Sequence, residues 1–218
     1  MSKKEINEVM ETLEKYYQDT QPTVRRTSEN SSPFKVLIAC LISLRTRDET
    51  TEKVTKKLFE EADTPEALAN IKTKKLEKLI YSSGYYKNKA RTIKRVSKKI
   101  IQDYNGTVPN DKEELLSIKG IGPKTANVVL SFAFDKNVIP VDTNVHRIAN
   151  RLGWVQTGKF KFEDTEKALE PILPKKWWKE INTLFILHGR RICTPQSPKC
   201  SKCPIEDYCS KVGVEKER

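Results

Sequence analysis

One stretch, residues 110–153, decides the fold: NDKEELLSIKGIGPKTANVVLSFAFDKNVIPVDTNVHRIANRLG. Its apolar residues recur at helical spacing in three separate runs, which predicts three helices joined by short connections. Pro109 and Asn110 mark the start of the first helix, with Asn110 as its N-cap. Gly153 follows the third helix, where glycine commonly ends a helix. The pattern therefore predicts a helical hairpin that leads into a further helix.

The turn inside this hairpin, residues 119–124, has the sequence KGIGPK. Its two glycines allow positive φ angles and leave backbone N–H groups accessible, and Pro123 suits the first position of a helix. Free N–H groups beside a helix N-terminus bind anions, and the two lysines of the segment add positive charge. We therefore expect a phosphate group to bind here, at Lys119, Gly120, Ile121 and Gly122.

The third helix has one apolar face, because its apolar residues lie at i, i+3, i+4 and i+7: Val145, Ile148, Ala149 and Leu152. Asp142 stands just before this helix, where its carboxylate can accept N-cap hydrogen bonds. The positive end of the helix dipole favours a negative charge there, so we expect an ionised carboxylate. Lys124 thus begins one helix and Asp142 the next. From residue types alone, a capped helical hairpin with a surface lysine is the simpler interpretation.

Two segments, LLSIKGIGPKTANVVLSFAF (115–134) and VDTNVHRIANRLGW (141–154), together resemble the endonuclease III family of DNA glycosylases. They match its helix-hairpin-helix motif and its Gly/Pro…Asp segment. In that family the lysine after the hairpin is the nucleophile and the aspartate of the VDT segment is its partner. Lys124 and Asp142 occupy those two positions. The resemblance implies a DNA glycosylase and abasic-site lyase that excises oxidised pyrimidines and acts through a lysine Schiff base.

Three more positions take their interpretation from this resemblance. Arg45 stands where many members carry a glutamine that fills the gap left by a flipped base. Arginine can fill that gap with a cation and hydrogen bonds, which implies a changed preference for the opposite base. Asp48 matches an acidic pocket residue, and Tyr85 matches a wedge that enters the base stack. An aromatic ring can stack on bases, although capping a core is the other interpretation of Tyr85.

The chain is strongly basic, with 41 Lys+Arg against 29 Asp+Glu and a net charge of +12. This excess favours a polyanionic partner, and the resemblance makes that partner double-stranded DNA with damaged pyrimidines or abasic sites. The cationic run at 87–99 reads mostly as a solvated helix face. No apolar run reaches membrane-spanning length and residues 1–20 lack a signal-peptide core. We expect an intracellular monomer, cytoplasmic in a prokaryote, without a membrane partner.

Four of the five cysteines follow one another near the C-terminus with the spacing C-x6-C-x2-C-x5-C: Cys193, Cys200, Cys203 and Cys209. An intracellular location favours a metal site over disulfides. Four thiolates suit either tetrahedral zinc or a [4Fe–4S] cluster, and the spacing alone does not choose. The resemblance favours the cluster, because the spacing matches the iron–sulfur loop of that family. Since the loop itself has few cations, we expect Arg190 and Arg191 to contact phosphate.

The remaining sequence also reads as helices, with no convincing strand, so we expect an all-α protein. The apolar run 34–44 predicts a buried helix in which Cys40 is a structural thiol. The resemblance implies two helical domains with a DNA-binding cleft between them. Residues 25–135 would form a six-helix domain that carries the hairpin. Residues 1–24 and 136–218 would form a helical iron–sulfur domain.

Two other functions are compatible with parts of this pattern. A mismatch or adenine glycosylase of the same superfamily would remove a normal base, but most such enzymes lack the lysine at 124. The adenine type also carries a further C-terminal domain that we do not expect here. A DNA-binding protein without enzymatic activity would use the hairpin and a zinc loop as clamps. It would leave abasic DNA uncut and lack the iron absorption at about 400 nm.

Overall fold

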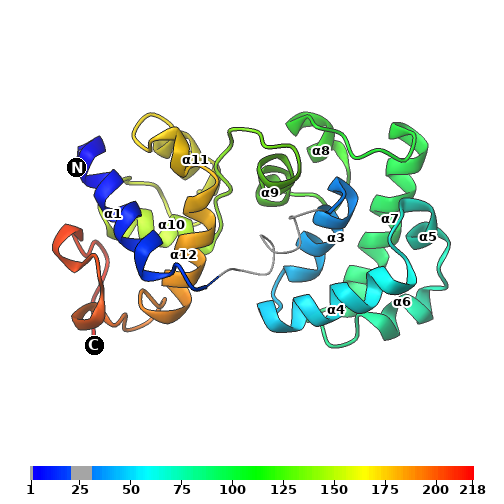
Figure 1. Cartoon of the computed structure of the whole chain (residues 1–218), viewed down its shortest axis with the longest axis horizontal. Helices are drawn as coiled ribbons and strands as arrows, with labels where there is room; N and C mark the ends of the chain where they lie inside the picture. The colour runs from blue at the N-terminus through cyan, green and yellow to red at the C-terminus, as the bar shows by residue number, and fades with distance from the viewer. Residues whose placement is uncertain (1, 21–30) are drawn as a thin grey trace. The chain divides into compact units, whose positions relative to one another are not determined.

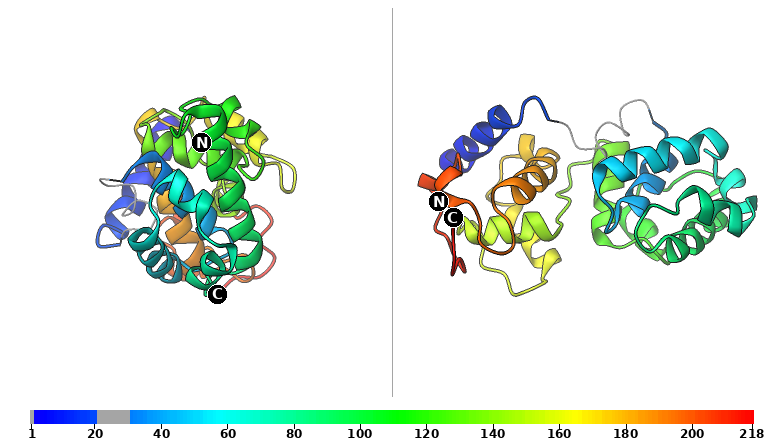
Figure 2. Two further views of the ribbon diagram at one scale, coloured as in Figure 1. Left: turned by 90° about the vertical axis from the view of Figure 1, so that its right-hand side faces the viewer. Right: turned by 90° about the horizontal axis from the view of Figure 1, so that it is seen from below.

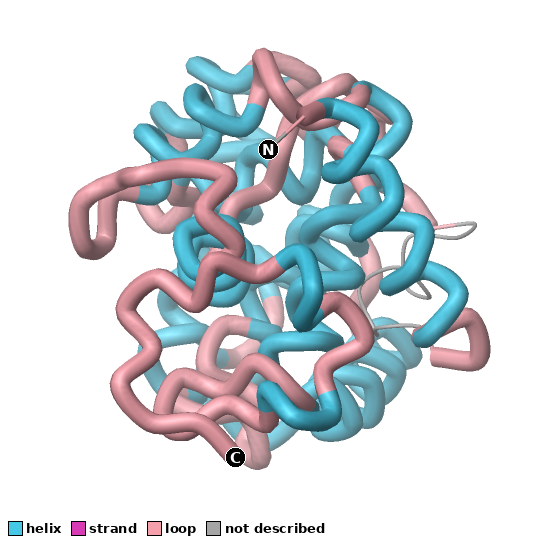
Figure 3. Tube along the Cα trace, turned by 90° about the vertical axis from the view of Figure 1, so that its left-hand side faces the viewer, coloured by secondary structure: helices cyan, strands magenta, loops and turns pink. Residues whose placement is uncertain are grey.

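The structure is a computed structural model that describes residues 2–20 and 31–218. Every regular element in these two ranges is a helix, as Figures 1 and 3 show, and this confirms the expected all-α class. Within the same ranges, no helix combines the length and the apolar character needed to cross a bilayer. The chain divides into two compact units, one formed by Met1–Gln21 with Asn137–Arg218 and the other by Pro22–Lys136.

The described part of the Pro22–Lys136 unit contains seven α-helices: α3 (Pro33–Ser43), α4 (Asp48–Glu61), α5 (Pro65–Asn70), α6 (Thr73–Leu79), α7 (Tyr86–Tyr104), α8 (Lys112–Ser117) and α9 (Pro123–Ala133). The domain expected over residues 25–135 had six helices. As the sequence indicated, α5 and α6 are two separate short helices, because the chain leaves helical geometry at Ile71 and Lys72.

The centre of this unit is α3, whose side chains are nearly all buried because its sequence is apolar on every face. It packs against α4, α7 and α9, while α5 and α6 pack against α7 (Figure 2). Ser32 caps α3 by accepting a hydrogen bond from the N–H of Lys35, as the Ser-Pro pair predicts. Cys40 lies in the core, and burial raises the pKa of its thiol to about 11. It is the structural thiol that we expected.

The hairpin helix α8 begins one residue later than expected. The N-cap is Asp111, whose carboxylate accepts the N–H groups of Glu113 at 2.9 Å and Glu114 at 3.1 Å. The prediction of Asn110 as the cap was wrong because the carboxylate of the next residue can satisfy two helix N–H groups at once. The hairpin itself is as predicted, since α8 packs against α9.

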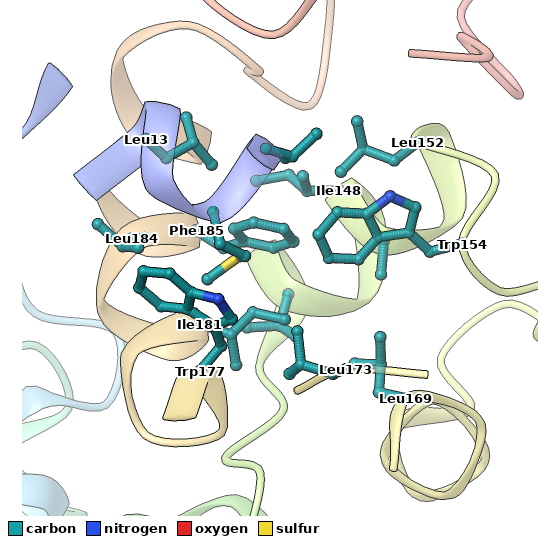
Figure 4. Close-up of a cluster of buried hydrophobic side chains, with 14 of the residues drawn as sticks. Leu13, Ile148, Leu152, Trp154, Leu169, Leu173, Trp177, Ile181, Leu184 and Phe185 are labelled. Carbon is teal, nitrogen blue, oxygen red and sulfur yellow. The ribbon is translucent and has the colours of Figure 1, made fainter. Parts of the chain in front are cut away.

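The second unit contains four α-helices in its described part, with three short 3-10 turns: α1 (Lys3–Tyr16), α10 (Thr143–Arg151), α11 (Phe162–Leu169), η1 (Lys175–Trp177), α12 (Glu180–Arg191), η2 (Cys200–Lys202) and η3 (Glu206–Tyr208). Figure 4 shows its core, in which Phe185 of α12 is fully buried and its ring centroid lies 5.6 Å from that of Trp154. The apolar faces of α1 and α10 contribute to the same core. This packing fixes α10, which carries Asp142 at its start, against α12, which leads into the cysteine loop.

Candidate functional site

The turn before α9 contains two glycines, and its backbone requires glycine at only one of these positions, residue 120. Gly120 has φ +113°, and a Cβ there would lie 2.7 Å from Cγ2 of Thr92 and 3.2 Å from a guanidinium nitrogen of Arg95. Gly122 has φ −100°, so only the first of the two glycines uses the positive φ that both allow. Apart from Gly122 and its two chain neighbours, no heavy atom of the described residues lies within 4 Å of a Cβ built on Gly122. The N-terminus of α9 is therefore open to a ligand at this point.

The same turn is fixed on both sides. Ile121 is buried, and its N–H donates to the carbonyl of Ile118 at 3.0 Å. Arg95 of α7 donates from Nε to the carbonyl of Lys119 at 3.0 Å, while the Lys119 side chain stays exposed. A rigid turn that presents a cation beside a helix N-terminus suits a phosphate group.

Lys124 is the second residue of α9, directly after Pro123 at the first helical position. It is half-buried. The charge of Lys124 acts on the Cys40 thiol and partly opposes the rise in pKa that burial causes there. The lysine therefore lies near the central helix α3, and its backbone position is set by the start of α9.

Asp142 caps α10, as the sequence predicted. Its Oδ1 accepts the N–H groups of Asn144 at 2.8 Å and Val145 at 2.9 Å, and its Oδ2 accepts the Asn144 side-chain amide at 3.0 Å. Both carboxylate oxygens are thus held, and the side chain is half-buried. Lys124 and Asp142 belong to different units of the chain.

Arg45 and Tyr85 lie together, although 40 positions separate them in the sequence. The guanidinium carbon of Arg45 lies 5.3 Å from the centre of the Tyr85 ring, a cation–π arrangement. Both residues have left-handed backbones, with φ +53° and +58°, which costs about 1–2 kcal/mol each. Between them, a Cβ on Gly84 would lie 2.8 Å from the Arg45 carbonyl oxygen, so this close approach requires glycine. Tyr85 is 64% exposed and does not cap a core.

Lys89 is a residue of this region that the sequence did not single out. It is only 7% exposed, and its Nζ donates to the carbonyl of Ile42 and to Oγ1 of Thr46, both at 2.6 Å. These bonds tie the end of α3 and the following loop, which carries Arg45, to α7. The sequence predicted that the cationic run at 87–99 is mostly a solvated helix face, and nothing in the neighbouring residues marks Lys89 as buried. Asp48, the first residue of α4, follows the same loop.

The four C-terminal cysteines line one cavity, as expected from their spacing. Burial raises the pKa of the Cys200 and Cys203 thiols to about 11, so thiolates there require a compensating positive charge such as iron. Arg151 donates to Sγ of Cys193 at 3.3 Å, and Nε2 of His188 lies 3.6 Å from Sγ of Cys203. Thiols with N–H groups beside them fit an iron–sulfur cluster, whose sulfurs accept such bonds.

The shared cavity and the four thiols suit either a zinc ion or a [4Fe–4S] cluster. Arg190 and Arg191, at the end of α12 just before this loop, are both exposed.

The fold and these sites together define a helix-hairpin-helix DNA repair protein. Residues 38–175 match the HhH-GPD superfamily of base excision DNA repair proteins, and residues 193–209 match the iron–sulfur binding domain of endonuclease III. The chain belongs to the endonuclease III family. Endonuclease III of Thermotoga maritima is 48% identical, covering 84% of this chain and 85% of the relative. That of Bacillus subtilis is 40% identical, covering 83% and 82%.

Solved structures agree with this assignment. A structure described as a trapped endonuclease III–DNA covalent intermediate is 37% identical, covers 97% of both chains and has a TM-score of 0.85. A thermostable thymine-DNA glycosylase shares the fold at 24% identity, with a TM-score of 0.84. The protein is thus a DNA N-glycosylase and abasic-site lyase, and its cofactor is a [4Fe–4S] cluster. Family membership favours this enzyme class over a DNA-binding protein without enzymatic activity.

The buried amine of Lys89 predicts a pH dependence of stability. Burial lowers its pKa from 10.5 to about 8. Between these two values the unfolded chain binds more protons than the folded one, so stability rises with pH. We expect the free energy of unfolding, measured against a Lys89→Met variant, to gain about 2 kcal/mol between about pH 7.5 and about pH 10. The exposed Lys87→Met variant is the control, and an equal profile for both variants would contradict the assignment.

The cysteine cavity predicts which thiols hold the cluster. Cys203→Ser should lose most absorbance at about 400 nm and most of its roughly four irons per chain. Cys40→Ala should keep both, because Cys40 lies in the core of the other unit. The measurement is the iron content and visible spectrum of protein purified without oxygen. A Cys203→Ser variant with a full complement of iron would rule out Cys203 as a ligand.

Proposed function

We propose that this protein excises oxidised pyrimidines from double-stranded DNA as a monomer, through a Schiff base on Lys124, and cuts the strand by β-elimination. The observation that carries the proposal is the place of Lys124. It follows a rigid turn with an open helix N-terminus, so a phosphate held by the turn would bring a sugar within reach of the amine.

DNA binding in this proposal begins at the hairpin turn. Two solved relatives are endonuclease III–DNA complexes, one of them covalent. In this chain the turn 119–122 would hold one phosphate, with Lys119 adding its charge. Arg190 and Arg191 would contact further phosphates, because both are exposed before a loop that has few cations of its own.

A glycosylase must expose C1′ of a nucleotide inside a duplex, so it flips that nucleotide out of the stack. Arg45 and Tyr85 are suited to fill the space left behind, because they form one exposed pair on linked loops. The ring would stack on a neighbouring base, and the guanidinium would donate hydrogen bonds to the base opposite. Asp48, which begins α4 shortly after Arg45, would face the flipped base.

The chemical steps follow from the amine. Unprotonated Nζ of Lys124 attacks C1′, the bond from C1′ to the base breaks, and the base leaves with the electron pair and gains a proton. The attacking nitrogen then gives up one of its two protons, the C1′–O4′ bond breaks, and O4′ takes up a proton, which leaves an iminium ion that keeps the other N–H proton. A proton then leaves C2′, and the C3′–O bond breaks with the phosphate as leaving group. A hydroxyl cannot form an imine, so the reaction requires a lysine.

Asp142 would act on the same sugar. Its carboxylate would stabilise positive charge on the opening ring and help transfer the protons. Hydrogen bonds to both of its oxygens fix its orientation before substrate arrives, which is a requirement for electrostatic stabilisation of this kind. A mismatch or adenine glycosylase is the second candidate. Its structural support is the shared fold with a thymine-DNA glycosylase, and Lys124 favours the lyase mechanism over it.

The substrate class can be tested with a panel of duplexes. Each duplex carries one oxidised pyrimidine, one oxidised or alkylated purine, or one mismatch, opposite each of the four bases. We expect base release and strand cleavage mainly at oxidised pyrimidines, since a saturated ring stacks poorly and is cheap to flip. Preferential release of a normal mismatched base would contradict the proposal and favour the second candidate.

The nucleophile can be trapped. With abasic-site DNA and borohydride, the protein should form a covalent adduct that resists denaturation. Lys124→Ala should form at least about a hundredfold less adduct, because no other side chain takes over the imine. The exposed lysine variant Lys56→Ala is the matched control and should trap normally. An undiminished adduct in Lys124→Ala would remove Lys124 from the mechanism.

A further inference from the structure

A continuous set of hydrogen bonds joins the Asp142 carboxylate to the cysteine loop. Oδ2 of Asp142 accepts the side-chain amide N–H of Asn144 at 3.0 Å. Oδ1 of Asn144 accepts Nη2 of Arg147 at 3.0 Å. The guanidinium of Arg147 in turn donates to the carbonyl of Cys193 from Nη2 at 3.0 Å and from Nε at 3.3 Å. Cys193 is the first cysteine of the loop, so the hydrogen bonds run without a break from the Asp142 carboxylate to a residue of the cluster loop.

Arg147 is oriented by backbone atoms. Besides the Cys193 carbonyl, it donates to the carbonyls of Gly189 and Thr143, both at 3.3 Å. Three fixed carbonyls from α10, α12 and the cysteine loop therefore set the plane of its guanidinium. Its remaining partner is the amide oxygen of Asn144. The Cys193 carbonyl helps to place the guanidinium, and the guanidinium in turn places the Asn144 amide.

The helix α12 is shaped to admit this pair of side chains. A Cβ built on Gly189 would lie 2.5 Å from Oδ1 of Asn144 and 2.7 Å from Nη2 of Arg147. Any larger residue at 189 would push both groups away. Glycine inside a helix costs about 1 kcal/mol relative to alanine, and here it permits the approach. The contact between Asn144, Arg147 and α12 is thus a packed arrangement and not an exposed surface bond.

We infer that Asn144 is a positioning residue that transmits the placement of the iron–sulfur loop to the Asp142 carboxylate. The inference deepens the proposed function, because it rests on Asp142 acting on the sugar. An amide is required at 144, since it donates to the carboxylate with its NH2 group and accepts from Arg147 with its oxygen. The cluster would then support the chemical step as well as binding, because the loop that it holds orients the carboxylate.

The test replaces the NH2 group of the Asn144 side chain by an oxygen atom, as in Asn144→Asp. Asn144→Asp keeps the shape and the acceptor for Arg147, but it places a second carboxylate oxygen against Asp142 in place of a donor. Repulsion between the two should turn Asp142 away from its present orientation. Asn150→Asp is the matched control, because Asn150 lies on the same helix and bonds to the His146 carbonyl and to Thr157.

The measurements are the single-turnover rate constant of base release at saturating enzyme, the Kd for the duplex, and the absorbance at about 400 nm per chain. For Asn144→Asp we expect at least about a tenfold loss of rate, less than about a threefold change in Kd, and unchanged absorbance. Asn150→Asp should keep its rate. Asn144→His should recover most of it, because a neutral imidazole also has one donor and one acceptor.

The outcomes separate this inference from the proposed function. Asp142→Asn is measured alongside and should bind the duplex yet release little base. If it loses activity while Asn144→Asp keeps the wild-type rate, the positioning role is overturned and the function of Asp142 stands. If Asp142→Asn keeps its activity, the role of Asp142 fails and the inference fails with it. Loss of absorbance in Asn144→Asp would show that Asn144 only holds the loop together. No recovery in Asn144→His would overturn the requirement for a donor and an acceptor at 144, and with it the positioning role.

Discussion

The unsatisfied N–H groups at a helix start are the constraint on which both candidate catalytic residues depend. At α10 two of these groups, the N–H groups of Asn144 and Val145, donate to the Asp142 carboxylate at 2.8 and 2.9 Å and so fix its position. At α9 no side chain caps the helix: Gly122 precedes it, and Pro123 removes one donor. The N–H groups at the start of α10 are thus bound by a residue of the chain, whereas those at the start of α9 are left for a ligand. In the proposed function, a phosphate of DNA would bind at the open start of α9.

Features with local signals could be read from the sequence. The Ser-Pro start of α3, Pro123 and the Asp142 cap each depend on neighbours within a few positions, and all three are present. The cap of α8 was misplaced by one residue because Asn110 and Asp111 both have capping side chains. Local patterns thus fixed the type of each element better than its boundary.

The contacts that orient the site could not be read in this way, because they join distant segments. Lys89 reaches a carbonyl 47 positions away, and Arg147 reaches one 46 positions away. Each residue looks in the sequence like another surface cation. Only the folded chain shows that one is buried against α3 and that the other joins α10 to the cysteine loop. His188 is similar: it lies between the Tyr17 hydroxyl and a cysteine sulfur.

The contact between Arg45 and Tyr85 bears on how the free protein meets DNA. Each side chain has the other as its neighbour, and both backbones are held in a conformation that few residues adopt. The guanidinium therefore covers a face of the ring that a nucleobase would otherwise cover. In the proposed function, entry into a duplex would exchange one planar π partner of the ring for another, so little rotamer freedom would be lost at that moment. The guanidinium of the free protein would thus hold the ring in an orientation suited to stacking.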